Sequence, residues 1–286
     1  MQTVILGAQG KLGGVLHRHA RRAGLGWLGQ GRREGVDLLW SPDCAPRAEV
    51  FPAGGTVINM IGRASPDEKA LRHANIELTR QILHHATAHG VAHVVLASSA
   101  AVYGNAADGP VAETATLSPL IPYGHSKAEM EAVAADYAQR PDSPALTILR
   151  IGNVAGSDAL TAIARQRCTT GEPMDLHRFP DGAAPVRSYI GPRDLFDVVT
   201  AVAQTPPASS RILNVAAPTP VDLEAVMTAY QTHFLPDLRW QDTPVPNGVP
   251  KQVILSTQAL ERLIHLPSGP DYAAKLALQV KQDLAP

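Results

Sequence analysis

The sequence has few cysteines, few aromatic residues and almost no net charge. Its 286 residues include two cysteines, Cys44 and Cys168, and 5% aromatic residues, and the formal net charge at pH 7 is −1. Two cysteines without paired or metal-type spacing argue against a disulfide scaffold and indicate a reducing compartment. A net charge near zero gives no electrostatic reason to expect a nucleic acid or a membrane surface as a partner.

Long apolar runs are also absent. No stretch reaches the ~18 apolar residues that cross a bilayer. The first apolar stretch lacks the basic lead of a signal peptide and meets glycines after a few residues. We therefore expect a soluble, cytoplasmic protein. An apolar content of 45% over 286 residues is sufficient for one large or two small domains with a sizeable core.

A glycine turn follows directly after the first predicted strand, at residues 3–6. It reads Gly7-Ala8-Gln9-Gly10-Lys11-Leu12-Gly13 and leads into a predicted helix that ends near Gly24. Strand, glycine turn and helix are the context of a dinucleotide-binding site, with the pyrophosphate at the helix N-terminus. The spacing is one residue longer than G-x-G-x-x-G, and an ordinary strand–helix turn is the alternative.

A second predicted strand, at residues 27–30, leads into Gly31-Arg32-Arg33. An acidic residue at this place binds the 2′-hydroxyl of the adenosine ribose, whereas Arg accommodates a 2′-phosphate. The pattern favours NADP over NAD, although Glu34 follows the two arginines. A solvated basic turn is the alternative.

Tyr123 and Lys127 lie four residues apart in a predicted helix, downstream of Ser98 and Ser99. Residues at this spacing share a helix face, so we expect the ammonium to lie near the phenol and to lower its pKa. Such a phenol can give a proton to a carbonyl oxygen or take one from an alcohol, and a Ser hydroxyl can hold the same oxygen. The pattern indicates the acid–base half of hydride-transfer chemistry.

Predicted strands and helices alternate up to residue 153, which favours a Rossmann-type, doubly wound parallel sheet. Further strands are expected at 56–61, 93–97 and 145–150. A long helix is expected after Ser65, which could cap it, with Gly90 just past its end; a second helix is expected at 123–140 and a loop at 105–122. Gly7, Gly62, Ser99 and Asn153 each follow a strand, at the edge where such sheets bind ligands. We predict a dinucleotide-binding domain at residues 1–153, with one more strand near 212–216, and a smaller, mixed, proline-rich substrate region at 154–286.

With these residues assembled, the sequence resembles the extended short-chain dehydrogenase/reductases, the NAD-dependent epimerase/dehydratase group that acts on nucleotide sugars. The resemblance is carried by the glycine turn, by Asn75, and by residues 98–104 (SSAAVYG) and 122–127 (PYGHSK) with Glu129. It continues through residues 149–154 and 181–195.

The resemblance implies a cofactor, NADP or NAD, and a sugar or nucleotide-sugar substrate. Ser99, Tyr123 and Lys127 would be catalytic, with Lys127 also bonding the nicotinamide ribose. Ser99, Asn153 and Arg187 would meet the substrate, and a structural salt bridge is the alternative for Arg187. The residues expected to bind the cofactor are Gly7, Gln9, Gly10, Lys11, Leu12, Gly13, Arg32, Arg33, Met60, Ile61, Gly62, Asn75, Ala97, Ser98, Tyr123 and Lys127.

Two departures from this group narrow the reaction. Its 4,6-dehydratases place an acidic pair just after the catalytic hydroxyl, where this sequence has Ala100 and Ala101, so dehydration is disfavoured. The glycine turn looks closest to the 4-keto-deoxysugar reductases, and with Arg32 and Arg33 it favours a reductase using a dissociable cofactor. A nucleotide-sugar epimerase with tightly bound NAD and a non-catalytic NAD(P)-sensing protein are the alternatives. The resemblance also implies a homodimer.

Other patterns have simpler interpretations. His85 and His89 have metal-ligand spacing but no third ligand, so we expect a solvated helix face and no metal site. Asp194 could belong to the substrate segment or cap a helix. Tyr103 could be a site residue or part of the core.

Overall fold

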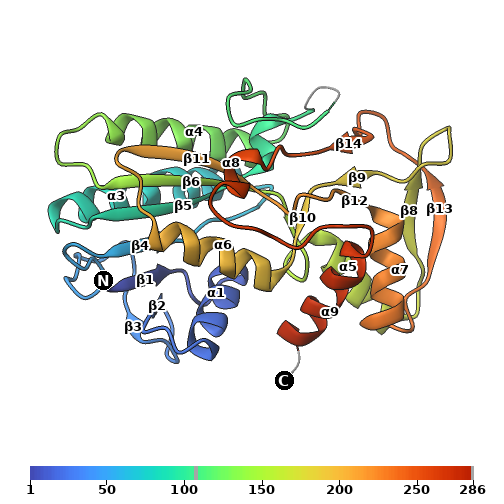
Figure 1. The fold of residues 1–286 in the computed structure, drawn as a ribbon, viewed down its shortest axis with the longest axis horizontal. Coiled ribbons are helices and arrows are strands. Elements are labelled where there is room, and N and C mark those ends of the chain that lie inside the picture. Colours follow the sequence, from blue (N-terminus) through green and yellow to red (C-terminus); the bar gives the residue numbers. More distant parts are fainter. Residues whose placement is uncertain (106–108, 285–286) are drawn as a thin grey trace. The chain divides into compact units, whose positions relative to one another are not determined.

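A computed structural model of the chain describes residues 1–105 and 109–284 (Figure 1). The chain divides into two compact units. Unit 1 comprises residues 1–104, 113–151 and 196–214, and unit 2 comprises residues 105–112, 152–195 and 215–286. The loop predicted at residues 105–122 includes residues 106–108, which lie outside the described ranges.

Unit 1 is built on a seven-stranded sheet. Its strands are β1 (Thr3–Leu6), β2 (Leu28–Gly31), β3 (Leu38–Leu39), β4 (Thr56–Asn59), β5 (His93–Ser99), β6 (Ala145–Ile151) and β11 (Ser210–Val215). They lie in the order β3-β2-β1-β4-β5-β6-β11, and the strands from β3 to β6 pair in parallel. The apolar runs of β1 and β4 are wholly buried, as a sheet covered on both faces requires. The predicted Rossmann-type sheet is confirmed.

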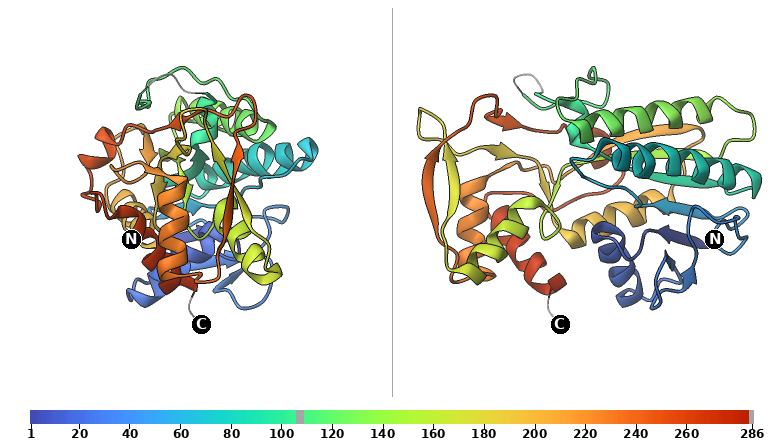
Figure 2. Two further views of the ribbon diagram at one scale, coloured as in Figure 1. Left: turned by 90° about the vertical axis from the view of Figure 1, so that its right-hand side faces the viewer. Right: turned by 180° about the vertical axis from the view of Figure 1, so that it is seen from behind.

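Helices cover both faces of this sheet (Figures 1 and 2). On one face α3 (Leu78–Ala88) packs against α4 (Pro122–Ala138), and α4 also contacts β5 and β6. On the other face lie α1 (Lys11–Arg22) and α6 (Pro192–Gln204). His19 of α1 stacks on Phe196 of α6 with ring centroids 5.5 Å apart. The helices thus leave the carboxyl ends of the strands as the place where ligand-binding turns can gather.

The helix predicted to start at Ser65 starts later and is interrupted. Its first segment is α2 (Glu68–Leu71), and Asp67 caps it by accepting hydrogen bonds from the backbone of Lys69 and Ala70, so the prediction of a Ser65 cap is wrong. A π-helical segment, η1 (Arg72–Glu77), then leads into α3. Such turns are rare and frequently occur at functional sites. Here η1 holds Asn75 in the interior, with no exposed surface.

Unit 2 has an apolar core of its own. Two aromatic side chains at its centre, Tyr230 and Tyr272, are fully buried among apolar residues. Strand β13 pairs with β8, β10 pairs with β7, and β12 and β14 flank β9. The bounds of its elements are β7 (Asn153–Val154), α5 (Ala159–Thr170), β8 (Met174–Arg178), β9 (Val186–Arg187), β10 (Tyr189–Ile190), β12 (Val221–Asp222), α7 (Leu223–His233), β13 (Trp240–Pro244), β14 (Gln252–Val253), α8 (Gln258–Glu261) and α9 (Tyr272–Leu284).

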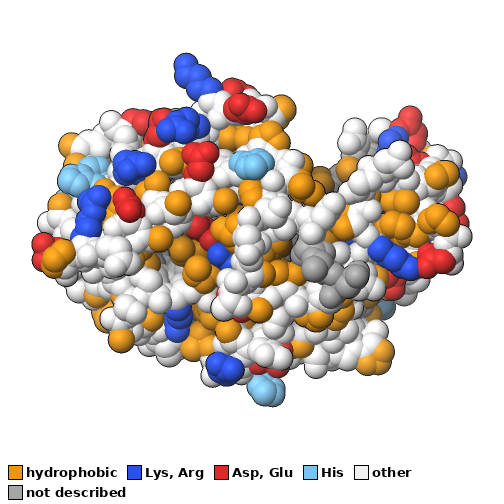
Figure 3. All heavy atoms as spheres, turned by 90° about the horizontal axis from the view of Figure 1, so that it is seen from above, with side chains coloured by type: hydrophobic (Ala, Val, Ile, Leu, Met, Phe, Trp, Pro, Cys, Tyr) orange, Lys and Arg blue, Asp and Glu red, His pale blue; other side chains and the backbone are white. Residues whose placement is uncertain are grey.

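Charged side chains of both signs are interspersed on the face shown in Figure 3. Within the described ranges, no helix combines the length and the apolar character needed to span a bilayer.

Candidate active site

The glycine turn forms a cradle at the carboxyl end of β1. Gly7 has a φ of +79°, in the left-handed region that favours glycine. A Cβ on Gly13 would lie 2.2 Å from the carbonyl oxygen of Gly7, so α1 can approach the turn only without a side chain at that position. Gly10 precedes α1 and offers no side-chain cap, and the first turn of α1 contains no acidic residue. The positive end of the helix dipole therefore faces the turn and favours a phosphate there.

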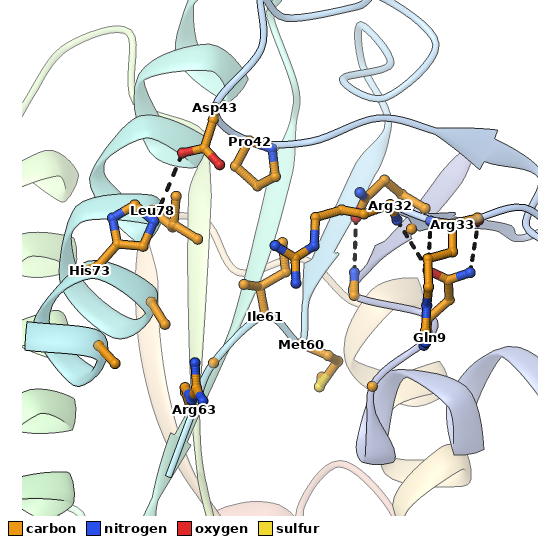
Figure 4. Close-up of a pocket in the computed structure, with 17 residues that line it drawn as sticks. Gln9, Arg32, Arg33, Pro42, Asp43, Met60, Ile61, Arg63, His73 and Leu78 are labelled. Carbon is orange, nitrogen blue, oxygen red and sulfur yellow. Dashed lines mark hydrogen bonds and ion pairs between the residues drawn. The ribbon is translucent and has the colours of Figure 1, made fainter. Parts of the chain in front are cut away.

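A pocket of about 770 Å³ opens beside this cradle, within unit 1 (Figure 4). It lies where the strand order changes direction between β1 and β4, the usual position of a ligand in such sheets. Its volume is in the range of cofactor sites. Cradle and pocket together therefore fit a dinucleotide. The predicted cofactor residues that line it are Gly7, Gln9, Gly10, Arg32, Arg33, Met60, Ile61 and Gly62.

Besides the predicted Arg32 and Arg33, the pocket contains charged side chains that the sequence analysis did not assign. Arg32 extends from the end of β2 toward Ile61 (Figure 4). Asp43, Arg63 and His73 line the same pocket, and Asp43 Oδ1 lies 3.8 Å from His73 Nε2. Arg63 could have been found, because it directly follows Gly62 at the end of a predicted strand. Asp43 and His73 belong to no motif, and only the folded chain brings them to the pocket.

The three residues predicted to be catalytic come together at the carboxyl end of β5. Ser99 ends that strand, and Tyr123 and Lys127 lie in the first two turns of α4. Lys127 Nζ donates a hydrogen bond of 2.8 Å to the carbonyl oxygen of Ala97 and lies 6.0 Å from the centroid of the Tyr123 ring. A Cβ on Gly62, which lines the pocket, would lie 3.1 Å from Lys127 Nζ. The cluster therefore adjoins the pocket.

The electrostatics of this cluster differ from the expectation. Burial raises the pKa of Tyr123, and the Ser99 hydroxyl, within hydrogen-bonding reach, acts to lower it. The expected lowering of the Tyr123 pKa by Lys127 is therefore wrong for this structure, because desolvation of the phenol is the largest influence and raises the pKa. Burial also lowers the pKa of Lys127 to about 8, and the Glu131 carboxylate acts to raise it. At pH 7 the phenol is protonated and the ammonium is charged.

A buried ion pair lies behind the cluster. Arg150 of β6 and Glu131 of α4 expose 4% and 5% of their side chains, and their Nη2 and Oε2 atoms are 2.7 Å apart. The Ser98 hydroxyl donates a hydrogen bond to Glu131. Successive side chains of a strand point to opposite faces, so Ser98 and its neighbour Ser99 can take part in different contacts. Tyr103 accepts a hydrogen bond of 2.8 Å from Arg150 and donates one of 2.7 Å to Asn214. Tyr103 is thus a buried structural residue in this network.

Asn75 connects the turn after β4 to the start of α4. Its amide accepts a hydrogen bond of 2.9 Å from the backbone of Arg63, and it donates to the Arg63 carbonyl and the Ser126 hydroxyl, both at 2.9 Å. Ser126 in turn donates to the carbonyl oxygen of Tyr123 at 2.8 Å. The side chain predicted to bind the cofactor therefore holds the backbone on both sides of the candidate site.

The substrate-side predictions Asn153 and Arg187 belong to unit 2. Asn153 begins β7 and pairs with Tyr189 of β10. The guanidinium of Arg187 donates to the carbonyl oxygens of Val186 and Pro250, at 2.8 and 3.0 Å. Within the part of the chain that the structure describes, no carboxylate pairs with Arg187, so the salt-bridge alternative does not explain it.

The remaining polar patterns have structural explanations. His85 and His89 both pack against the ring of Phe51, with centroid distances of 5.5 and 5.7 Å. Among the described residues, no group of three or more metal-ligating side chains lies together. Asp194, in the first turn of α6, accepts a hydrogen bond of 2.9 Å from the Tyr272 hydroxyl, within unit 2.

A Rossmann sheet with a glycine cradle and a Ser–Tyr–Lys cluster defines the class of nicotinamide-dinucleotide-dependent enzymes. The family model "NAD dependent epimerase/dehydratase family" matches residues 3–216. The chain belongs to this family.

Individual relatives act on UDP-sugars according to their names. A probable UDP-arabinose 4-epimerase from Oryza sativa subsp. japonica is 32% identical over 98 residues, which cover 34% of this chain and 24% of the relative. UDP-glucose 4-epimerase from Lactobacillus helveticus is 41% identical over 69 residues, which cover 24% of this chain and 21% of the relative. The matched segments thus span about a quarter of these relatives. The solved UDP-glucose-4-epimerase from Stenotrophomonas maltophila, with bound NAD and formylated UDP-arabinopyranose, has a TM-score of 0.84 at 19% identity and covers 99% of this chain and 98% of that one.

Proposed function

We propose that this protein moves a hydride between a nicotinamide dinucleotide and a sugar carbon of a nucleotide sugar, and that it works as an NADPH-dependent keto-sugar reductase. The observation that carries the proposal is the placement of Ser99, Tyr123 and Lys127 beside the glycine-lined pocket of unit 1. The named UDP-sugar epimerases among its relatives support the nucleotide-sugar substrate. Arg187, whose charge no described carboxylate neutralises, is suited to a substrate diphosphate.

The proposed mechanism assigns one task to each residue of the cluster. A bound dinucleotide supplies the hydride. Tyr123, whose pKa is raised by burial, is protonated at neutral pH and donates its proton to the keto oxygen. Ser99 donates a hydrogen bond to the same oxygen and orients it. Lys127 is charged at pH 7 and is held by the Ala97 carbonyl beside Gly62, where it can bond the cofactor ribose.

Two features favour the reducing direction. The phenol of Tyr123 is protonated at neutral pH and can give its proton to a ketone, whereas oxidation of an alcohol needs the phenolate as base. Arg32 and Arg33 are exposed at the pocket, where their guanidinium groups can bind the 2′-phosphate of NADPH. Ala100 and Ala101 supply no acid–base pair after Ser99, so the proposal does not include dehydration.

Replacing Tyr123 with Phe tests the catalytic assignment. We expect Tyr123→Phe to lose at least ~10²-fold in kcat, because the proton donor is removed. The dissociation constant for NADPH should change less than about twofold, since the ring remains. Turnover is followed by nicotinamide absorbance in a screen of keto-sugars and nucleotide sugars, and cofactor binding by fluorescence titration. A variant that keeps most of its turnover would contradict the assigned role, and a screen without any active substrate would favour a non-catalytic sensing protein.

A nucleotide-sugar epimerase with resident NAD is the second candidate, and the relatives named as 4-epimerases favour it. The two candidates differ in cofactor retention. An epimerase returns the hydride to the same substrate and keeps its NAD, whereas a reductase must exchange its cofactor. Denaturing the purified protein and analysing the released nucleotides distinguishes them. Stoichiometric NAD would establish the epimerase.

The expected homodimer is tested separately, by light scattering on the same preparation.

A further inference from the structure

The side-chain amide of Gln9 is fully occupied by the turn that follows β2. Its Oε1 accepts hydrogen bonds from the backbone N–H groups of Arg32 and Arg33, at 3.1 and 3.0 Å. Its Nε2 donates to the carbonyl oxygens of Arg33 and Glu34, at 2.8 and 3.2 Å. A Gln amide offers two acceptor and two donor positions, and all four are used here. Figure 4 shows the bonds to Arg32 and Arg33. The side chain therefore has no hydrogen bond left for a ligand.

The residue before the two arginines is adapted to this arrangement. A Cβ on Gly31 would lie 2.5 Å from Gln9 Oε1, so the Gln9 amide can occupy its place only because residue 31 is glycine. A second glutamine reinforces the connection in the opposite direction. Gln30 Oε1 accepts from the backbone N–H of Gly7 at 3.0 Å, and Gln30 Nε2 donates to the Trp40 carbonyl. The glycine turn and the end of β2 are thus tied together from both sides.

We infer that Gln9 is a positioning residue for cofactor specificity, which holds the backbone of Arg32 and Arg33 where their guanidinium groups meet an adenosine 2′-phosphate. This inference rests on the proposed preference for NADPH. Both arginine side chains are exposed, so they must be ordered when a ligand binds. A backbone that Gln9 already holds in place lowers the entropy cost of that ordering. NADH carries a hydroxyl where NADPH carries the phosphate. Loss of Gln9 should therefore weaken NADPH binding selectively.

The experiment compares the dissociation constants of NADPH and NADH, measured by fluorescence titration, for the wild type and Gln9→Met. Met keeps the length and the aliphatic stem of Gln but none of its four hydrogen bonds. We expect the dissociation constant for NADPH to rise roughly tenfold and that for NADH to rise less than about threefold. Gln81→Ala, on the exposed surface of α3 in the same unit, is the matched control and should leave both constants unchanged.

A second variant, Gly31→Ala, tests the same contact by changing the residue against which the Gln9 amide packs. In Gly31→Ala the new Cβ displaces the Gln9 amide without altering Gln9 itself, so this variant should lose the same NADPH selectivity. Unchanged selectivity in both folded variants, or equal weakening of both cofactors, would overturn the role of Gln9. A wild type that binds both cofactors equally would instead overturn the proposed NADPH preference, so the two failures are distinguishable.

Discussion

His93, the first residue of β5, has no exposed surface. Its Nε2 is 2.9 Å from the Thr147 hydroxyl, which also accepts a hydrogen bond of 3.1 Å from Arg211. Burial and the nearby Arg211 charge lower the pKa of His93 to about 4. The imidazole is therefore neutral in the folded protein over the whole range in which an unfolded His accepts a proton.

This neutral imidazole makes stability depend on pH. The pKa is about 6.5 in the unfolded chain and lower in the folded one, so between pH 6.5 and pH 4 only the unfolded chain binds the proton. The His93 contribution should fall by about 2 kcal/mol from pH 7 to pH 5. Urea unfolding at both pH values, for the wild type and His93→Asn, measures it. The variant should lose that much less stability than the wild type, and equal losses would contradict the assignment.

At the scale of secondary-structure elements, helix α4 carries both the candidate site and the ion pair behind it. Glu131 lies one turn after Lys127 and contacts Arg150 of β6 through three hydrogen bonds of 2.7 to 3.1 Å. Removing one partner leaves a buried charge without a counter-ion. The pair therefore fixes α4 against the sheet at the point where Tyr123 and Lys127 must be positioned.

A double-mutant cycle tests this coupling. We expect Glu131→Gln and Arg150→Met each to lower the free energy of unfolding by about 3 kcal/mol. The double variant should cost less than the sum of the two single changes by about 2 kcal/mol, because neither charge is then left alone. Urea denaturation gives all four values. Additive losses would show that the pair does not act as a unit.

The elements show how far the sequence determines the fold and the site. Apolar strands and the glycine turn predict the sheet, because their signals are local and repeat. The cap of α2 was misplaced, since Ser65 and Asp67 are both good caps and only the fold selects one. The role of Glu131 was missed because a carboxylate in a helix is normally solvated. The pKa of Tyr123 was misjudged because it depends on burial, which residue spacing does not report.

At the scale of the whole molecule, each of the two units has its own apolar core. The cofactor predictions lie in unit 1, and Asn153 and Arg187 lie in unit 2. A ligand of the first set of residues should therefore slow amide hydrogen exchange in unit 1, and a ligand of the second set should slow it in unit 2.

Cofactor binding should stabilise unit 1. At a free NADPH concentration of 100 times its dissociation constant, the unfolding free energy of unit 1 should rise by about 2.7 kcal/mol. Slower amide exchange in peptides covering β1 and β4, measured by mass spectrometry, would report it. Gly13→Ala is the control that should show no such slowing, because its Cβ would lie 2.2 Å from the Gly7 carbonyl oxygen. Protection gained equally by this variant would argue against binding at the cradle.

The buried pair of Glu131 and Arg150 also constrains how this protein can diverge. Any lineage that changes one of the two positions first must pass through an ancestor with an uncompensated interior charge, and about 3 kcal/mol is a large share of the stability of a typical domain. We therefore expect the two residues to be retained together, so that descendants that have lost Glu131 have also lost Arg150, and the reverse.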